Sequence, residues 1–320
     1  MALPAVADVR RTWPDAQLAI AARPSIAPLF SLVAGVDRVV TLPAAGRARD
    51  VAAALADGSF DAAIFLPNSF QIALAARRAG IPERWGYRAD WRGALLTRAV
   101  ARPSGVHQAE YYQHLVRRLG CTNGPMRPEL CASAAARAAG IELLRASGWN
   151  GTSPIVALAP GAAYGGAKRW PAESFASVAT ELSETDGATI VLVGAAVDAR
   201  SADEVAQSSR APIVNIVGKT DIPRLAGVLC AARGLITNDS GAMHFAAALG
   251  VPVTALFGPT REKETRPLAS EGSIEPAVLT HDVWCRPCML RECPLVHRCM
   301  RGITVDAVVA AARRSLSRTV

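Results

Sequence analysis

The sequence has no hydrophobic run long enough to cross a membrane as a helix. Such a helix needs roughly 20 consecutive apolar residues, whereas the longest apolar stretches, at 155–160 and 189–197, have the length of a strand. The first residues, MALPAVADVRRTWPD, also lack the basic segment and apolar stretch of a signal peptide. We therefore expect a soluble protein of the cytoplasm.

Charged residues are scarce as well. They make up 19% of the 320 residues, whereas hydrophobic residues make up 51%. A disordered chain has the opposite balance, so the composition excludes disorder and indicates a large buried core. The length allows two ordinary domains or one large α/β unit.

Lysine is nearly absent, since only Lys168, Lys219 and Lys263 occur. Arginine is the default cation, so a lysine inside a motif is notable. Residues 1–150 carry 18 arginines against 11 acidic residues, whereas residues 151–320 carry 17 basic and 16 acidic residues. The basic first half indicates an anionic partner, either a nucleic acid, a phosphorylated glycolipid or a membrane surface. Aromatic residues are only 5% of the chain and no nucleic-acid-binding motif is present, which argues against nucleic acid.

Seven cysteines fall into two groups. Three are scattered and are expected to be small buried hydrophobic residues: Cys121, Cys131 and Cys230. The other four follow the pattern C-x2-C-x4-C-x5-C: Cys285, Cys288, Cys293 and Cys299. Four thiols at this spacing could hold zinc or iron in a compact knuckle, or they could belong to a reduced structural loop. We expect the loop and no metal.

Strand and helix patterns alternate along the chain. In the first half, strands are expected at 17–23, 37–42 and 61–66 and helices at 25–33, 50–57 and 70–79. In the second half, strands are expected at 154–159, 189–194, 213–217, 235–237 and 251–257 and helices at 171–184, 223–232, 242–249 and 303–316. This alternation predicts an α/β protein with two Rossmann-like, doubly wound parallel-sheet domains that face a cleft. Gly, Ser, Asn and Pro gather at 146–154, so we expect the domains to span residues 1–150 and 151–320.

The segment PGAAYGGAKRWP at 160–171 follows a predicted strand. Its glycines let the backbone approach a ligand, and Lys168 and Arg169 supply positive charge. Pro171 is placed at the first turn of a helix, whose free N–H groups favour anions. The segment is neither a dinucleotide fingerprint nor a Walker loop, so the residues allow a phosphate site or a plain connection with exposed charges.

The segment NDSGAMH at 238–244 also joins a strand to a helix. Asp239 or Ser240 can cap the helix, and Gly241 leaves room for a ligand at its amino end. His244 lies one turn further on the same face as Ser240. The alternative reading is a capped helix with a core histidine.

These stretches resemble the heptosyltransferases of lipopolysaccharide synthesis, which form glycosyltransferase family 9. Four segments carry the resemblance, in family order: FDAAIFLPNSFQIALAARRAGIPERWGYRADWRGALL at 60–96, PGAAYGGAKRWP at 160–171, TNDSGAMHFAAALGVPVTALFGPT at 237–260 and WCRPCMLRECPLVHRCMRGI at 284–303. The chain is most similar to the family members that add the second heptose. The resemblance implies a GT-B fold with an amino-terminal acceptor domain and a carboxyl-terminal donor domain.

The resemblance also implies the substrates. The donor would be ADP-L-glycero-D-manno-heptose, and the acceptor the first heptose on a Kdo-lipid A precursor at the inner face of the inner membrane. The transfer would invert the anomeric centre and use no metal and no cofactor. Lys168 would contact the donor phosphates and stabilise the leaving group. The other donor-binding residues would be Ala163, Tyr164, Asp198, Thr220, Asp239, Ser240, Gly241 and His244.

The basic first half suits an anionic, phosphorylated acceptor. We expect Asn68 and Ser69 at a cleft-facing strand end. The cations that we place nearest the acceptor are Arg88, together with Arg77, Arg78, Arg84 and Arg92.

The sequence departs from the family at its start. Family members open with a buried strand and a Gly-Asp loop ahead of the helix that begins here at Met1, and that loop aspartate is their catalytic base. No residue of this sequence matches the base, and Asp8 and Asp15 belong to the helix and its exit. We expect the first strand of the amino-terminal domain to be missing from this sequence, with a native start about fifteen residues further upstream, enough for one strand and a turn.

Three alternatives to second-heptose transfer remain open at this stage. One is an ADP-heptose transferase that acts on Kdo or on a protein. Another is a catalytically impaired protein that binds ADP-heptose without turning it over. A nucleic-acid-binding protein fits the isoelectric point near 9.5 but has no motif in its favour.

Overall fold

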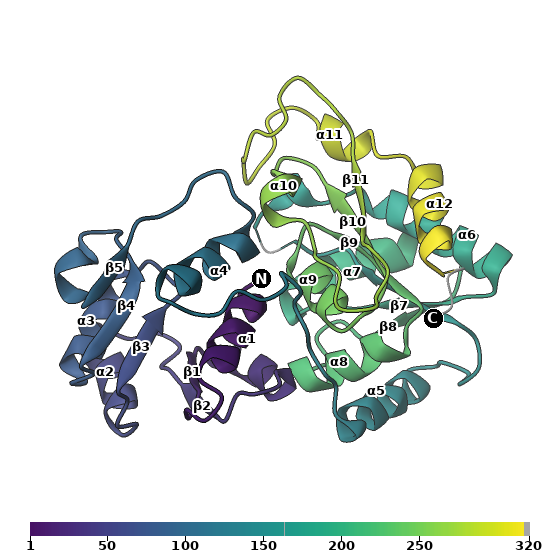
Figure 1. Cartoon of the computed structure of the whole chain (residues 1–320). Helices are drawn as coiled ribbons and strands as arrows, with labels where there is room; N and C mark the ends of the chain where they lie inside the picture. Colours follow the sequence, from purple (N-terminus) through teal and green to yellow (C-terminus); the bar gives the residue numbers. More distant parts are fainter. Residues whose placement is uncertain (163, 317–320) are drawn as a thin grey trace. The chain divides into compact units, whose positions relative to one another are not determined.

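The computed structural model describes residues 1–162 and 164–316, and the chain divides into two compact units, Met1–Met126 and Arg127–Val320 (Figure 1). Helix α5 (Ala134–Ala146), which precedes the expected boundary near residue 150, belongs to the second unit and packs against α8 (Ile222–Ala231). A Cβ on Gly140 would lie 2.4 Å from a backbone atom of Gly227, so two glycines permit this close helix contact.

The second unit is built on a six-stranded parallel sheet in the order β11-β10-β9-β6-β7-β8. Its strands are β6 (Ile155–Ala159), β7 (Thr189–Leu192), β8 (Ile213–Asn215), β9 (Gly234–Asn238), β10 (Val253–Phe257) and β11 (Ala277–Thr280). Strands β6, β9 and β10 are buried along their whole length. Their nearly continuous runs of Val, Ile, Leu and Ala are typical of parallel strands that are covered on both faces.

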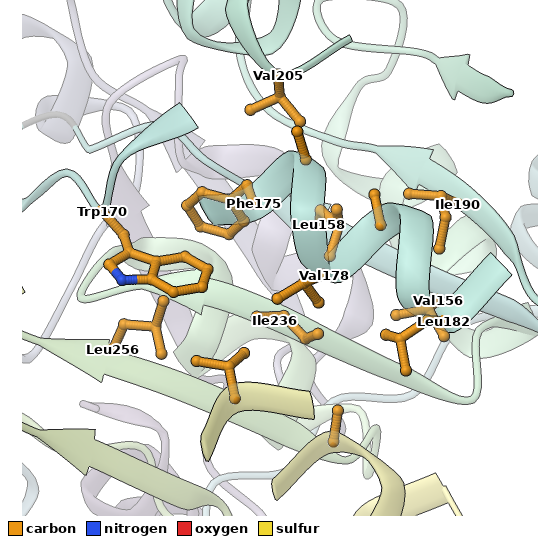
Figure 2. Packing of buried hydrophobic residues seen from close by; sticks show 14 of the residues in the cluster. Val156, Leu158, Trp170, Phe175, Val178, Leu182, Ile190, Val205, Ile236 and Leu256 are labelled. Carbon is orange, nitrogen blue, oxygen red and sulfur yellow. The ribbon is translucent and has the colours of Figure 1, made fainter. Parts of the chain in front are cut away.

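The hydrophobic core of this unit lies between the sheet and α6 (Ala172–Asp186) (Figure 2). Phe175 and Leu182 of α6 and the indole of Trp170 pack toward Leu158 and Leu256 of the sheet. Trp170 Nε1 also donates to the carbonyl of Ile303 at 3.0 Å. The remaining helices of the unit are η3 (Gly166–Lys168), η4 (Ala196–Asp198), α7 (Ala199–Ser208), α9 (Gly241–Ala248), α10 (Glu262–Thr265), α11 (Arg298–Arg301) and α12 (Val305–Leu316).

The first unit contains two separate parallel sheets. One pairs β1 (Ala19–Ala22) with β2 (Arg38–Thr41), and the other has the order β3 (Ala62–Phe65), β4 (Glu83–Tyr87), β5 (Arg98–Val100). Its helices are α1 (Leu3–Thr12), η1 (Ala27–Leu32), α2 (Ala48–Ala56), α3 (Phe70–Arg78), η2 (Arg92–Leu95) and α4 (Gln108–Arg118).

The two units differ at the centre of the sheet. In the second unit, β6 precedes α6 and lies between β7 and β9, which it joins into one sheet. In the described part of the first unit, no strand joins β1 to β3. The sheet of this unit is therefore in two parts.

Most predicted elements are confirmed, with one change of type. The helix expected at 25–33 is the 3-10 helix η1, which has Pro28 in its first turn. The strands β4, β5 and β11 were not predicted, and neither were the helices α4, α5, α7, α10 and α11 or the 3-10 helices η2, η3 and η4. Among the described residues, no helix is both long enough and apolar enough to cross a membrane.

Candidate functional site

Two strand-to-helix connections of the second unit lie side by side at the carboxyl ends of its central strands. Strands β6 and β9 pair in parallel, so the segment after Ala159 and the segment after Asn238 leave the sheet at the same edge. In open parallel sheets this edge is where ligands bind. The sequence predicted both segments as candidate sites, and the structure brings them together.

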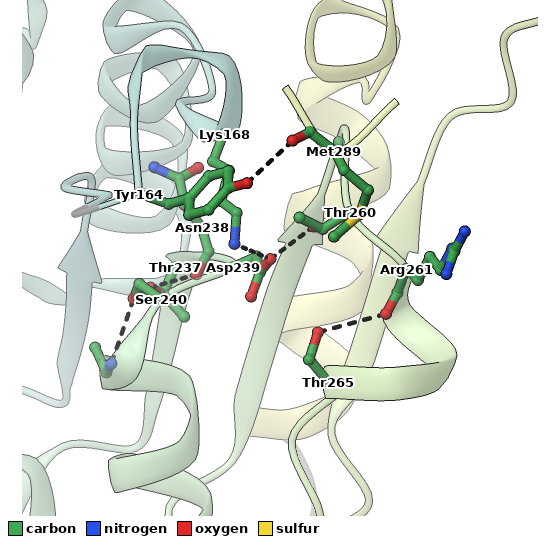
Figure 3. A network of polar contacts seen from close by, with 12 residues as sticks. Tyr164, Lys168, Thr237, Asn238, Asp239, Ser240, Thr260, Arg261, Thr265 and Met289 are labelled. Carbon is green, nitrogen blue, oxygen red and sulfur yellow. Dashed lines mark hydrogen bonds and ion pairs between the residues drawn. The ribbon is translucent and has the colours of Figure 1, made fainter. Parts of the chain in front are cut away.

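Lys168 and Asp239 link the two connections. Lys168 Nζ donates to Asp239 Oδ2 at 2.6 Å, and Thr260 Oγ1 donates to the same oxygen at 2.6 Å (Figure 3). The side chains of Lys168 and Asp239 are only 12% and 7% exposed. A lysine that is paired in a largely buried position is held in one place.

Asn238 fixes the connection after β6 from beneath. Its Nδ2 donates to the carbonyl of Pro160 at 2.7 Å, and its Oδ1 accepts from the backbone N–H of Trp170 at 3.0 Å. Asn238 is fully buried, and its amide thus holds both ends of the turn that carries Lys168. We did not predict this role, although a polar residue at the end of a buried strand is the signal that could have shown it.

Helix α9 begins at the same place. Ser240 is its N-cap and accepts from the N–H of Ala242 at 3.3 Å, and Thr237 Oγ1 lies 3.1 Å from Ser240 Oγ. A Cβ on Gly241 would meet no atom within 4 Å, so this helix start is open. The free N–H groups of such a helix start favour an anion. His244 lies one turn further along the helix.

The turn itself contains Tyr164, whose ring centroid lies 4.7 Å from Lys168 Nζ. A cation at this distance from an aromatic face is attracted by the ring. Of the other predicted donor residues, Ala163 lies outside the described residues.

Asp198 lies at the same edge of the sheet, beyond β7. Its Oδ2 accepts from the N–H of Ala195 at 3.1 Å. A Cβ on Gly161 would lie 2.1 Å from Asp198 Oδ1, so the carboxylate packs directly on the turn after β6. Thr220 is half-buried in the connection after β8, two strands from β6.

In the first unit, Asn68 connects buried polar groups. Its Nδ2 donates to Tyr111 Oη at 2.8 Å, and its Oδ1 accepts from Arg92 at 3.2 Å. Arg92 is fully buried and also donates to the carbonyls of Tyr87 and Pro67. Arg92 therefore offers no exposed charge to an acceptor, contrary to our expectation, because its guanidinium is satisfied within the unit.

The other predicted acceptor residues are placed differently. Arg84 donates to the carbonyls of Leu95, Ile81 and Pro82, so it too is used within the unit. Ser69 is the N-cap of α3. The exposed arginines among the predicted set are Arg77, Arg78 and Arg88.

A basic cavity of about 410 Å³ opens beside β5 and was not predicted. Its charged lining comes from Arg98, Arg102 and Arg118, and His114 also lines it. Burial lowers the pKa of His114, and the neighbouring guanidinium groups of Arg117 and Arg118 lower it further. Such a concentration of positive charge attracts anions.

The four clustered cysteines are not joined by disulfides in the structure. Among residues 1–162 and 164–316, no group of three or more His, Cys, Asp or Glu side chains is arranged to hold a metal ion. Cys299 is buried, and its thiol has a raised pKa because of burial and the nearby Cys293, Cys285 and Cys288.

The chain is similar to known glycosyltransferases over most of its length. The model of glycosyltransferase family 9 (heptosyltransferase) matches residues 48–298. Lipopolysaccharide heptosyltransferase 2 of Escherichia coli (strain K12) is 30% identical over 281 residues, which cover 82% of this chain and 80% of that protein. The corresponding Salmonella typhimurium protein is also 30% identical, over 83% of this chain and 81% of its own length.

Solved structures agree in fold. The structure of E. coli ADP-heptose LPS heptosyltransferase II superposes with a TM-score of 0.82 at 26% identity and covers 99% of this chain and 94% of that one. A family 9 glycosyltransferase from Veillonella parvula has a TM-score of 0.86 at 21% identity over 99% of this chain and 93% of its own.

Proposed function

This chain belongs to glycosyltransferase family 9, the heptosyltransferases, and has their GT-B fold, and from this we propose that it adds the second heptose to the lipopolysaccharide inner core. The donor is ADP-L-glycero-D-manno-heptose and the acceptor is the first heptose of heptosyl-Kdo-lipid A. The second unit, Arg127–Val320, binds the donor, and the first unit, Met1–Met126, binds the acceptor. The similarity to lipopolysaccharide heptosyltransferase 2 of E. coli supports this choice among heptosyl transfers.

The pair of Lys168 and Asp239 carries the proposal. As the bond from the heptose anomeric carbon to the phosphate oxygen breaks, negative charge collects on the departing ADP. Lys168, already fixed by Asp239 at 2.6 Å, stabilises that charge without reorganising, which is the most effective form of electrostatic catalysis. Asp239 also accepts hydroxyl hydrogens of the heptose.

The remaining donor groups surround this pair. The backbone N–H groups of Ser240 and Gly241 at the start of α9 face the pyrophosphate, with His244 beside it. Tyr164 lines the turn, and Ala163 is assigned to donor binding as well. Asp198 binds the ribose and Thr220 lies near the adenine, since both follow strands on the β7–β8 side of the sheet. The acceptor hydroxyl attacks the anomeric carbon from the opposite face and loses its proton to a base that is not assigned in this sequence, which inverts the anomeric centre, and no metal or cofactor takes part.

The acceptor is a glycolipid with phosphate groups, and positively charged side chains of the first unit attract these phosphates. Arg88 is exposed, Asn68 and Ser69 lie after β3, and the basic cavity beside β5 provides further positive charge for phosphate. Trp91 is 97% exposed and follows Asp90 in the left-handed region, so an indole is presented to solvent. Indoles prefer the membrane–water interface, which supports peripheral contact with the cytoplasmic face of the inner membrane.

A transfer assay tests the proposal directly. The chain is incubated with ADP-heptose and heptosyl-Kdo-lipid A, and released ADP and the mass of the glycolipid are measured. One added heptose is the expected result. Transfer to Kdo-lipid A or to a protein instead would reassign the acceptor, and binding of ADP-heptose without transfer would show a catalytically impaired donor-binding protein.

A further inference from the structure

The cysteine-rich part of the chain lies directly on the turn that carries Lys168. The N–H of Ala167 donates to the carbonyl of Arg291 at 2.9 Å, and the N–H of Gly166 donates to Glu292 Oε1 at 3.0 Å. We call residues 289–292 the strap. Two consecutive amides of the turn are thus held by a segment that lies more than a hundred residues later in the sequence.

The side chain of Tyr164 adds a third contact to the strap. Its hydroxyl donates to the carbonyl of Met289 at 3.0 Å, as Figure 3 shows. The same ring receives Lys168 Nζ at 4.7 Å and the guanidinium carbon of Arg291 at 5.2 Å from its centroid. Tyr164 therefore connects the strap to the lysine.

Two glycines make this approach possible. Gly165 has a φ of 153°, and a Cβ there would lie 2.3 Å from the carbonyl oxygen of Arg291. A Cβ on Gly166 would lie 2.7 Å from Glu292 Oε2. A side chain at Gly165 would press on the backbone of the strap and keep the two segments apart, whereas one at Gly166 would displace only the end of the Glu292 side chain.

The strap is also anchored on the other side of the ion pair. The N–H of Met289 donates to the carbonyl of Pro259 at 2.9 Å, and the next residue, Thr260, donates to Asp239. These contacts form a closed network. It leads from Lys168 through the turn to the strap, from the strap to the segment with Thr260, and from Thr260 through Asp239 back to Lys168. A closed network of this kind fixes a charged side chain more firmly than one ion pair can.

We propose that the strap is a positioning element for donor binding, and that Glu292 is its principal positioning residue. The turn has little regular structure of its own, since η3 has only three residues. Glycine-rich backbone loses much entropy when it is ordered, and a catalytic group must be held to within about 0.5 Å. Glu292 and the carbonyl of Arg291 supply this order before the donor arrives. The inference rests on the proposed function, because it assigns the donor phosphates to Lys168.

Substitution of Glu292 tests the role. We expect Glu292→Ala to raise the KM for ADP-heptose and the Kd for ADP about tenfold, the cost of one hydrogen bond to a charged group, with a smaller change in kcat. Glu292→Gln keeps an oxygen for the N–H of Gly166 and should stay within about twofold of the wild type. Glu184→Ala, at an exposed carboxylate of α6, is the matched control.

A double-mutant cycle adds a readout that a general loss of stability would not produce. The new methyl group in Gly166→Ala displaces the Glu292 side chain. The loss of donor affinity that Gly166→Ala causes should therefore largely vanish in a chain that already carries Glu292→Ala. Wild-type donor affinity in Glu292→Ala, or equal losses in Glu292→Ala and Glu292→Gln, would overturn the proposal while leaving the transferase intact. A wild-type chain that neither binds ADP nor transfers heptose would instead refute the proposed function.

Discussion

Lys168 and Asp239 meet at 2.6 Å across two connections that are 71 positions apart in the sequence. Each side chain balances the charge of the other in a largely buried place. Removal of either one leaves a charge without its partner, which costs more than the pair itself contributes. Substitution of either residue therefore tests the role of the pair.

We expect Lys168→Ala to lower the rate of heptose transfer at least tenfold, because the departing ADP loses its fixed cation. Steady-state transfer assays measure this change. Circular dichroism should show an intact fold, since Lys168 lies in a turn outside the sheet. A turnover equal to that of the wild type would remove Lys168 from the donor site.

We expect Asp239→Ala to lower transfer at least tenfold as well, because Lys168 loses the partner that positions it and the heptose loses a hydrogen-bond acceptor. The loss of transfer activity in the double variant should be much smaller than the product of the two single losses, because the two residues act as one unit. Simple multiplication of the two single effects would show that the residues act separately.

Stability of the first unit should depend on pH through His114. Burial and the guanidinium groups of Arg117 and Arg118 lower its pKa in the folded chain, whereas unfolding restores the ordinary value of 6.5. Below pH 6.5 the unfolded state therefore binds more protons than the folded state. The contribution of neutral His114 to the free energy of unfolding is complete above pH 6.5 and is lost as the pH falls through the lowered pKa. Urea unfolding at about pH 7.5 and about pH 5.5 should show a smaller pH effect in His114→Gln than in the wild type.

The basic cavity should recognise phosphate on the acceptor. Arg98→Glu combined with Arg102→Glu reverses two charges of its lining and should raise the KM for phosphorylated acceptor at least fivefold, about 1 kcal/mol. Acceptor that has been treated with phosphatase should show little difference between variant and wild type. Arg38→Glu, at the start of β2, controls for net charge, and an equal effect there would place the phosphate elsewhere.

Asp8 supports structure and not chemistry. It is 1% exposed, and it accepts from Gln113 Nε2 at 2.9 Å, from the N–H of Gly124 at 2.9 Å and from Arg11. Asp8→Ala removes the acceptor that these three donors share and should lower the free energy of unfolding by about 2 kcal/mol. The exposed Asp15→Ala is the control, and chemical denaturation compares them.

Trp91 should contribute to membrane contact. An indole that is 97% exposed gains by entering a headgroup region, so Trp91→Ala should weaken binding to vesicles of anionic phospholipid several-fold. Co-sedimentation measures the bound fraction. Trp284→Ala, at an 81% exposed tryptophan of the second unit, should have no such effect, and equal losses would point to nonspecific adsorption.

The sequence predicted the strands of the second unit better than those of the first. Strands such as β6 are continuous apolar runs that end on glycine or asparagine, so both ends of the element are visible in the residues. Strand β4 contains Glu83, Arg84 and Trp85 and has no such run, because its neighbours and not its own hydrophobicity place it in a sheet.

For the site, single motifs could be read but their contacts could not. The turn with Lys168 and the start of α9 were both identified, yet nothing in the residues shows that Asn238 ties one to the other or that residues 289–292 lie on the turn. Such contacts depend on chain segments that are brought together by the sheet, and single-sequence patterns carry only local information. Buried Arg92 illustrates the same point, since its sequence context is that of an exposed cation.

The division of the first unit into two sheets has a consequence for handling the protein. Among the described residues, β1 pairs only with β2 and β3 only with β4, so one side of each strand presents unpaired backbone groups. Such edges are templates on which a strand of another chain can pair. At high concentration the first unit should therefore be where copies of this chain adhere to one another, and solutions should keep best when they are dilute.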